Sequence, residues 1–263
     1  MFSEEAWARH LFPAKEFHNM RYYLALKELQ HADYSPVYMP QLLAAKTMAV
    51  PKERPQTIDD IPMEIELWER WYATPSVSIT GYTTRGTPAV VFAHIPTYLT
   101  DPDVLERAER DYMEDLLAGK KVMRRVPVPN REFLRLLDLE DKEKVFVLVG
   151  VEFEEYANSP SGIISAKTIK GVLAHPAVIP FIGGEEAAVD YIKAHQMLWG
   201  KGKIGIWHTT LIGERPSGNL LYAGSSNLSS ISIDSFSCDG RFIGFPNVSS
   251  RKPLEELTTI SSK

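Results

Sequence analysis

Cys238 is the only cysteine in the chain of 263 residues. This excludes an intrachain disulfide framework and any zinc or iron–sulfur site that needs several cysteines of one chain. No run of about 20 consecutive apolar residues occurs, so the sequence predicts no membrane-spanning helix. The first residues, MFSEEAWARHLF, lack a basic stretch followed by an apolar one and predict no secretory signal. We therefore expect a cytoplasmic protein.

An excess of positive charge is also missing. The formal net charge is −5, so no general basic field favours a nucleic-acid partner. Hydrophobic residues make up 44% of the chain and charged residues 24%, which is typical of globular proteins. A chain of this length buries enough surface to fold without a disulfide or a metal ion.

The first part of the chain is predicted to be helical and interrupted by prolines. Residues 17–30, 41–48 and 63–72 have apolar side chains at helical spacing. Residues 50–62 contain several prolines and are the best linker candidate. We therefore expect a helical N-terminal segment over residues 1–62, a core domain over 63–245 and a loosely attached tail over 246–263.

The middle of the chain alternates strands with helices. Residues 77–84 and 89–95 predict a β-hairpin, and Thr100-Asp101-Pro102-Asp103 has the capping residues that open a helix, which Gly119 ends. Further strands are predicted at 121–128, 144–153 and 177–182, and further helices at 130–139, 165–173 and 185–199. Residues 203–245 then predict a four-strand antiparallel meander. The expected fold class is α+β, with a mixed or mainly antiparallel sheet and helices packed on it.

His208 is the first candidate site residue, because its neighbours on the predicted strand are apolar. It shares the parity of Ile204, Ile206 and Ile212, so its imidazole is expected to point inward. Such burial costs on the order of a few kcal/mol unless the ring has a hydrogen-bond partner. His208 is therefore either a general acid/base or metal ligand, or a core histidine bonded to a carbonyl or hydroxyl.

Two further candidates carry the same ambiguity. His94 shares the parity of Val90 and Phe92 at the end of a buried strand, where it faces either a cleft or the water at the sheet margin. Asp234 lies on the polar face of its strand, where it either orients His208 or belongs to the solvated surface. No spacing fixes these residues as metal ligands on one element, so we predict no metal site.

Ser226 lies in the segment Gly224-Ser225-Ser226-Asn227. Together with His208, this segment resembles the His-x-Lys … Gly-Ser-x-Asn pattern of the phospholipase D superfamily. However, Thr210 stands at the lysine position, Arg215 stands where the aspartate would fall, and no second copy occurs. We do not assign that family. Ser226 is a candidate for polarising a substrate, or else part of a turn that local side-chain hydrogen bonds favour.

Aromatic residues suggest a different kind of site. They could stack on a planar or sugar ligand, or they could belong to the core. The residues concerned are Trp68, Trp71, Trp199, Trp207, Tyr22, Tyr23, Tyr34 and Tyr38.

Two functions follow from these observations. The first is an enzyme that processes a small molecule by hydrolase or lyase chemistry, with His208 as the base, Asp234 orienting it, and His94 or Ser226 polarising the substrate. The sequence identifies neither its substrate nor a cofactor. The alternative is a non-catalytic interaction or assembly protein that docks through its aromatic N-terminal helices. We expect a small-molecule ligand and a possible homo-oligomer, with neither nucleic acid nor membrane as a partner.

Overall fold

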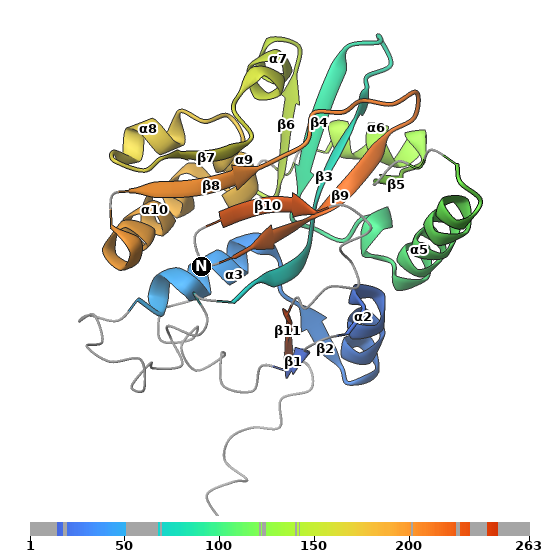
Figure 1. Ribbon diagram of the computed structural model, residues 1–263, viewed down its shortest axis with the longest axis horizontal. Helices are drawn as coiled ribbons and strands as arrows, with labels where there is room; N and C mark the ends of the chain where they lie inside the picture. The colour runs from blue at the N-terminus through green and yellow to red at the C-terminus, as the bar shows by residue number, and fades with distance from the viewer. Residues whose placement is uncertain are drawn as a thin grey trace, which may run out of the picture.

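One β-sheet runs through the protein, and helices pack on both of its faces (Figure 1). The computed structural model describes residues 15–17, 20–50, 68, 70–120, 122, 125–139, 141, 143–200, 202–224, 227–231 and 241–246. This architecture confirms the predicted α+β class. None of the helices within these ranges is long and apolar enough to cross a membrane.

The strands follow the order β1-β11-β3-β9-β10-β8-β7, with β2 beside β11, β4 between β3 and β6, and β5 beside β9. Their bounds are β1 (Lys15–Phe17), β2 (Tyr34–Pro36), β3 (Tyr72–Tyr82), β4 (Pro88–Ala93), β5 (Val126–Pro127), β6 (Val145–Val149), β7 (Gly162–Ser165), β8 (Lys203–Trp207), β9 (Ser217–Ala223), β10 (Asn227–Ile231) and β11 (Arg241–Pro246).

The α-helices are α2 (Tyr22–His31), α3 (Met39–Met48), α5 (Pro102–Leu117), α6 (Asn130–Leu137), α7 (Val151–Asn158), α8 (Ile169–Leu173), α9 (Val178–Ile182) and α10 (Glu185–Trp199), and a 3-10 turn, η2, spans Tyr98–Thr100. Asp101 caps α5 by accepting a hydrogen bond from the Asp103 N–H, as its sequence predicted.

The predicted hairpin is present as β3 and β4, which pair antiparallel. The prediction of a four-strand antiparallel meander over residues 203–245 is wrong, because the C-terminal strands are distributed through the sheet rather than paired in sequence order. β9 and β10 pair antiparallel, but β8 pairs parallel with β10, and β11 pairs parallel with β3. The C-terminal strands therefore lie on both sides of β3, and the last one brings the end of the described chain back to β1 and β2.

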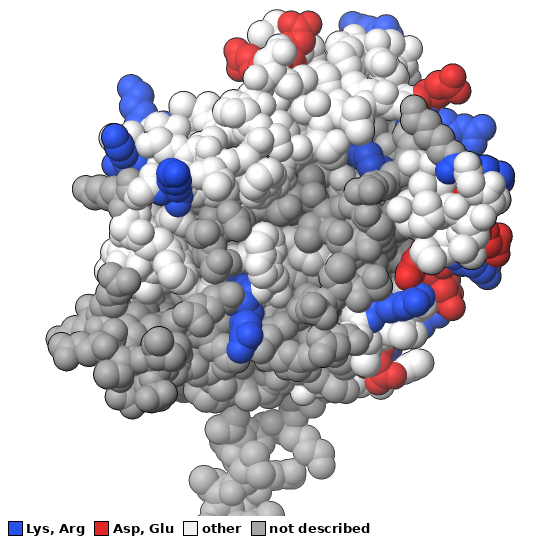
Figure 2. Space-filling view, in the orientation of Figure 1, with Lys and Arg blue, Asp and Glu red and all other residues white. Residues whose placement is uncertain are grey.

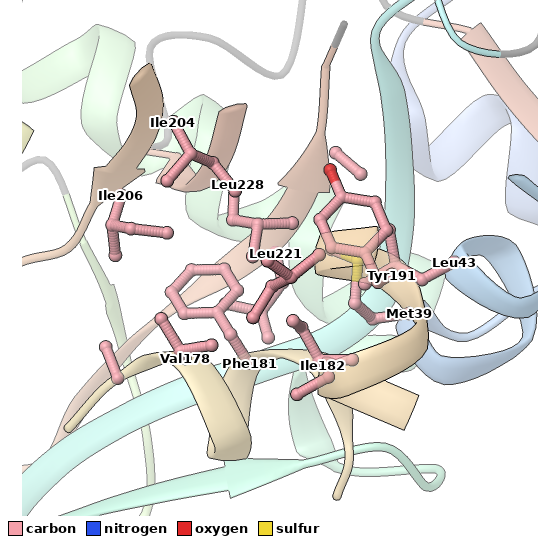
Figure 3. Close-up of a cluster of buried hydrophobic side chains, with 14 of the residues drawn as sticks. Met39, Leu43, Val178, Phe181, Ile182, Tyr191, Ile204, Ile206, Leu221 and Leu228 are labelled. Carbon is pink, nitrogen blue, oxygen red and sulfur yellow. The ribbon is translucent and has the colours of Figure 1, made fainter. Parts of the chain in front are cut away.

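The larger core lies between the sheet and the helices α3, α7, α8, α9 and α10. Figure 3 shows side chains of α3, α9 and α10 packed against strands β8, β9 and β10. The sequence pattern explains this contact, because Ile204 and Ile206 alternate with residues of the opposite face, as do Leu221 and Ala223.

A second core covers the opposite face of β3, β4 and β9. Helices α2, α5 and α6 pack there, through residues such as Leu29, Leu105 and Phe133, against Val77 and Ile79 of β3. Strand β3 is consequently buried at every position except Tyr82.

Buried hydroxyl groups on β3 link it to segments far away in the sequence. Thr74 Oγ1 donates to the Leu221 carbonyl at 2.8 Å, and Thr80 Oγ1 donates to the Leu211 carbonyl at 2.7 Å. Between them, Ser76 Oγ accepts a hydrogen bond from the Met39 N–H at 2.8 Å. The alternating Ser and Thr residues of this strand are therefore interior cross-links.

Three further sequence predictions, of individual elements, are wrong in detail. Residues 144–153 form strand β6 and then helix α7, because Gly150 at a φ of 62° turns the chain between them. Residues 177–182 form helix α9, since a short apolar run does not distinguish a buried strand from a buried helix. Within 121–128, only Val126–Pro127 is a described strand.

Lys46 of α3 is fully buried, and its amine lies beside the end of β9. Its Nζ donates to the Gly224 carbonyl at 2.9 Å and to the Ala223 carbonyl at 3.4 Å. The same atom lies 5.8 Å from the ring centroid of Trp68 and 5.5 Å from that of Tyr72. Burial lowers the pKa of this ammonium from 10.5 to about 7. The interior therefore favours the neutral amine.

We expect stability to rise as the pH increases from 7 to 9. The unfolded chain binds more protons than the folded chain between the folded pKa of Lys46, about 7, and its unfolded value of 10.5. The free energy of unfolding should rise by about 2 kcal/mol from pH 7 to pH 9. Urea denaturation should show this rise in the wild type and in Lys193→Met, an exposed control, but not in Lys46→Met. An equal rise in Lys46→Met would contradict the assignment.

Gly218 should tolerate no side chain. A Cβ there would lie 2.5 Å from Leu99 Cδ1, 2.9 Å from Ile79 Cγ1 and 3.1 Å from the Ser78 carbonyl oxygen. We expect Gly218→Ala to lower the free energy of unfolding by about 1–3 kcal/mol through overpacking. Gly202→Ala is the matched control, because no atom lies within 4 Å of a Cβ at that position. Equal unfolding midpoints of the two variants would contradict this prediction.

Candidate functional site

One part of the sheet has no helix over it within the described part of the chain. Helices α2, α5 and α6 cover β3, β4 and β9, but no described helix lies in front of β8 and β7 in Figure 1. The register pairs Ile163 with Gly205 and Ser165 with Lys203, so these residues share this uncovered side with Trp207. We call the surface formed by Ile163, Ser165, Lys203 and Trp207 the open face.

The open face combines exposed apolar area with little negative charge. Ile163 is 63% exposed and Trp207 44% exposed, on adjacent strands. In Figure 2, which has the same orientation, the acidic side chains lie along the top and right margins. Basic side chains stand at the left of the same view, so the charge near the open face is positive.

Two tryptophans flank this face. The Trp207 ring lies beside Gly162, 3.9 Å from the position that a Cβ would take. Trp71, 39% exposed, packs on Gly224 directly after β9, and its ring atoms lie 2.6–2.8 Å from the corresponding Cβ position. Because β10 and β8 lie between β9 and β7, the two backbone supports, Gly224 and Gly162, are three strand spacings apart, or about 14 Å.

The loop after β8, residues 208–216, borders the open face and is held by hydrogen bonds to its backbone. Ser161 Oγ donates to the His208 carbonyl at 2.9 Å, and Tyr156 Oη donates to the Thr209 carbonyl at 3.0 Å. The Leu211 carbonyl accepts from Thr80 Oγ1 and from Arg125. The Leu211 side chain remains 72% exposed.

Arg125 is the buried cation that fastens this loop. Besides the Leu211 carbonyl, its guanidinium donates to Thr80 Oγ1 at 2.7 Å and to the Ser217 carbonyl at 2.6 Å. Burial lowers its pKa to about 10. Arg125 also lines a cavity of about 330 Å³ between α5 and β5, together with Arg107 and Asp111. With its terminal nitrogens already bonded to the protein, we assign Arg125 to the support of the loop.

His208 directly follows β8 and is fixed by the segment after α7. Ser159 Oγ donates to the Tyr156 carbonyl at 2.7 Å, so at 3.1 Å it accepts from His208 Nε2. The ring lies 4.6 Å from that of Tyr156 and 5.4 Å from that of His175. Burial, with a smaller contribution from His175, lowers the pKa of His208 to about 4. Its Nδ1 is buried with no partner within the described part of the chain.

His94 is a cross-link of the core. Nε2 lies 2.9 Å from the Pro180 carbonyl and must carry the proton, because a carbonyl only accepts. Nδ1 lies 2.9 Å from Ser76 Oγ, which also accepts from the Met39 N–H. Burial lowers the pKa of His94 to about 4. The neutral ring thus joins α9, β3 and α3, and both of its nitrogens are used.

The predicted catalytic group is not assembled within the described residues. No hydrogen bond or ring contact joins His94 to His208, and their partners differ. Asp234 and Ser226 lie outside the described residues, so the assignment of these four side chains to one site stays a prediction. No group of three or more His, Cys, Asp or Glu residues in those ranges could hold a metal ion.

Sequence reasoning missed the residues that build this region. Arg125, Ser76 and Ser159 were not singled out, because their partners lie on distant segments and no local spacing indicates them. Trp71 and Trp207 were noted as possible stacking residues. Their exposure depends on which helices leave the sheet uncovered, and no sequence pattern reports that.

Comparison with known proteins gives one informative match. No family model and no curated protein matches the chain. A solved structure described as "Accommodation of massive sequence variation in Nanoarchaeota by the C-type lectin fold" is 31% identical to it, with a TM-score of 0.67. The match covers 88% of this chain and 97% of that one. The likeness therefore extends over nearly the whole of both proteins.

This match corrects the function expected from the histidines. A C-type lectin fold points to binding rather than to a His-based hydrolase or lyase, so the enzymatic prediction and the hydrolase assignment are wrong. The non-catalytic alternative agrees better with the comparison. With this identity and coverage, the chain belongs to the family of C-type lectin fold proteins.

Proposed function

We propose that this protein is a non-catalytic binding protein that holds its ligand on the open face, between Trp71 and Trp207. The observation that carries the proposal is the family membership, a fold associated with binding. Two half-exposed tryptophans, Trp207 on the open face and Trp71 beside it at the end of β9, add a surface suited to that role.

The chemistry of the open face favours a ligand with a flat or ring-shaped apolar surface. Indole rings offer a large contact area, lose little conformational entropy and carry a polar N–H at one edge. Lys203 and Ser165 lie exposed on the same side of β8 and β7, where they can orient polar groups of the ligand. A small molecule containing a sugar or another planar ring fits this combination.

The aromatic residues of the N-terminal helices support the core instead. Tyr22 and Tyr23 of α2 are buried, and so is Trp68, which stacks on Tyr191 with ring centroids 5.4 Å apart. The binding role of the non-catalytic alternative is retained in our proposal. We place the binding surface on the open face rather than on α2 and α3.

The histidines take a supporting role in this proposal. His94 has both ring nitrogens bonded inside the core, and His208 donates to Ser159 while its other nitrogen is buried. The lone pair of His94 Nδ1 is used inside the core, and that of His208 Nδ1 is buried, so neither is exposed to a ligand as a general base requires. We propose that His208 positions the loop 208–216 beside Trp207.

Replacement of Trp207 should weaken ligand binding. A glycan array and an array of ring-containing metabolites would identify ligands of the wild type. Trp207→Ala should then lower the affinity at least tenfold, because a half-exposed indole at the centre of a contact typically contributes more than about 1.4 kcal/mol. Trp199→Ala is the matched control, since Trp199 at the end of α10 is 41% exposed, close to the 44% of Trp207.

Two outcomes would contradict the proposed function. Equal loss of affinity in Trp207→Ala and Trp199→Ala would mean that the open face is not the binding surface. A ligand recovered with an altered mass after incubation with the wild type would mean that the protein is catalytic.

The exposed residues of the open face and of the bordering loop 208–216 should be replaceable without loss of stability. The related protein is described as accommodating massive sequence variation in its C-type lectin fold. Here Ile163 and Leu211 are 63% and 72% exposed. Ile163→Ser and Leu211→Ser should change the free energy of unfolding by less than about 0.5 kcal/mol while they alter ligand affinity.

The control for this prediction is the buried neighbour Ile206, which is 0% exposed. Ile206→Ser should cost about 2–5 kcal/mol, because it removes buried apolar volume and adds a hydroxyl to the core. Urea denaturation compares the variants. A large loss of stability in Ile163→Ser or Leu211→Ser would show that the open face is part of the folding core.

A further inference from the structure

We propose that the free edge of β6 is a docking site for an extended peptide segment of a partner protein, which adds to the sheet as an antiparallel strand. This site lies on the far side of β4 from the open face, since the sheet order there is β3-β4-β6. It is therefore separate from the ligand surface proposed above.

Among the described strands, β6 has a partner on one side only. It pairs with β4. The His94 N–H donates to the Lys144 carbonyl at 2.8 Å, and the Gly150 N–H donates to the Pro88 carbonyl at 3.4 Å. These two bonds determine which residues of β6 direct their backbone groups toward β4. The N–H and C=O groups of Phe146 and Leu148 therefore face β4, whereas those of Val147 and Val149 point away from it. Within the described residues, no hydrogen bond satisfies the outward N–H groups of Val147 and Val149.

The free edge lies at the base of an apolar groove of about 570 Å³. Leu137 and Leu139 form one wall, on the side of the core that contains Val145. Pro176, Ile179 and Pro180 form the other wall, on the side that Phe146 and Leu148 face.

These walls suit a strand in particular. Successive side chains of an added strand point to alternate faces of the sheet, so each would meet one of the two apolar walls while the backbone pairs with β6. A peptide with several consecutive apolar residues fits this arrangement. An unpaired strand edge beside apolar surface is otherwise a position that proteins protect.

Acidic side chains beside the groove indicate which type of residue the peptide has at its N-terminal end. Glu152 and Glu155 of α7 line the groove just beyond the last residue of β6, and neither forms an ion pair with another described residue. An antiparallel peptide would have its N-terminal end at this position. A Lys or Arg there would pair with the two carboxylates, so the partner segment is an apolar stretch preceded by a basic residue.

The groove favours a single strand over a second copy of the chain. Both walls are formed by residues on either side of β6, so the edge is recessed between them. The β6 strand of a second copy would be recessed between identical walls. Two such edges cannot approach to the roughly 4.8 Å that strand pairing requires without collision of the walls.

The test uses the full chain and a fluorescein-labelled eight-residue peptide that begins with arginine and continues with alternating valine and isoleucine. Fluorescence anisotropy should show saturable binding. Val147→Pro removes an outward N–H without breaking a bond to β4, and we expect at least a tenfold loss of affinity. Glu155→Lys should weaken binding of the arginine peptide and strengthen binding of a glutamate analogue. The matched control is Glu114→Lys, at an exposed position on α5, which should change neither.

N-methylated peptides test the strand geometry without any change to the protein. Alternate N–H groups of a strand face the same neighbour, so methylation of one alternate set should abolish binding while methylation of the other set should preserve it. This comparison decides the proposal even if Val147→Pro fails to fold, which urea denaturation would reveal.

Three results would overturn the proposal. The first is equal affinity of the two methylated peptides, and the second is unchanged affinity of a folded Val147→Pro variant. The third is concentration-dependent dimerisation of the free chain that Val147→Pro abolishes, which would assign the edge to a second copy. Because Trp207→Ala leaves β6 intact, it should not change peptide binding, which separates this test from that of the proposed function.

Discussion

The hydroxyl side chains on one face of β3 hold together segments that the chain order keeps far apart. Thr74, Ser76 and Thr80 are buried, and each has a partner on another element: the Leu221 carbonyl, the Met39 N–H, and the Leu211 carbonyl. A buried hydroxyl without a partner would cost on the order of 1–3 kcal/mol, so these bonds select one arrangement of the elements around β3. The position of α3 and the path of the loop after β8 both depend on this arrangement.

Much of the fold could be predicted from local pattern. The β3–β4 hairpin and helices α3, α5 and α10 follow from alternation, capping and helical spacing, which act within a few residues. The errors arose where a short apolar run had to be assigned without its surroundings. Residues 177–182 became helix α9 because they pack in the core with α10 and α3, and 144–153 divided at Gly150.

The candidate site was predicted less well. His208 has the hydrogen-bond partner that one of its two interpretations required, whereas His94, expected at a cleft or at the sheet margin, is buried in the core. Their partners are Ser76, Pro180 and Ser159, on segments that sequence spacing cannot relate. Desolvation keeps both rings neutral, so their hydrogen-bonding capacity serves packing. The open face is defined by the helices that do not cover β7 and β8, which is a property of the whole fold rather than of any motif.

The bonds that fix the loop after β8 have a consequence for how its surface can change. The loop offers main-chain oxygens, those of His208, Thr209 and Leu211, to donors on Ser161, Tyr156, Thr80 and Arg125. Every residue type carries that oxygen, so a new side chain at Thr209, Thr210 or Leu211 leaves each tether in place. The rim of the binding surface can thus acquire a different chemical character one position at a time while the backbone keeps its course.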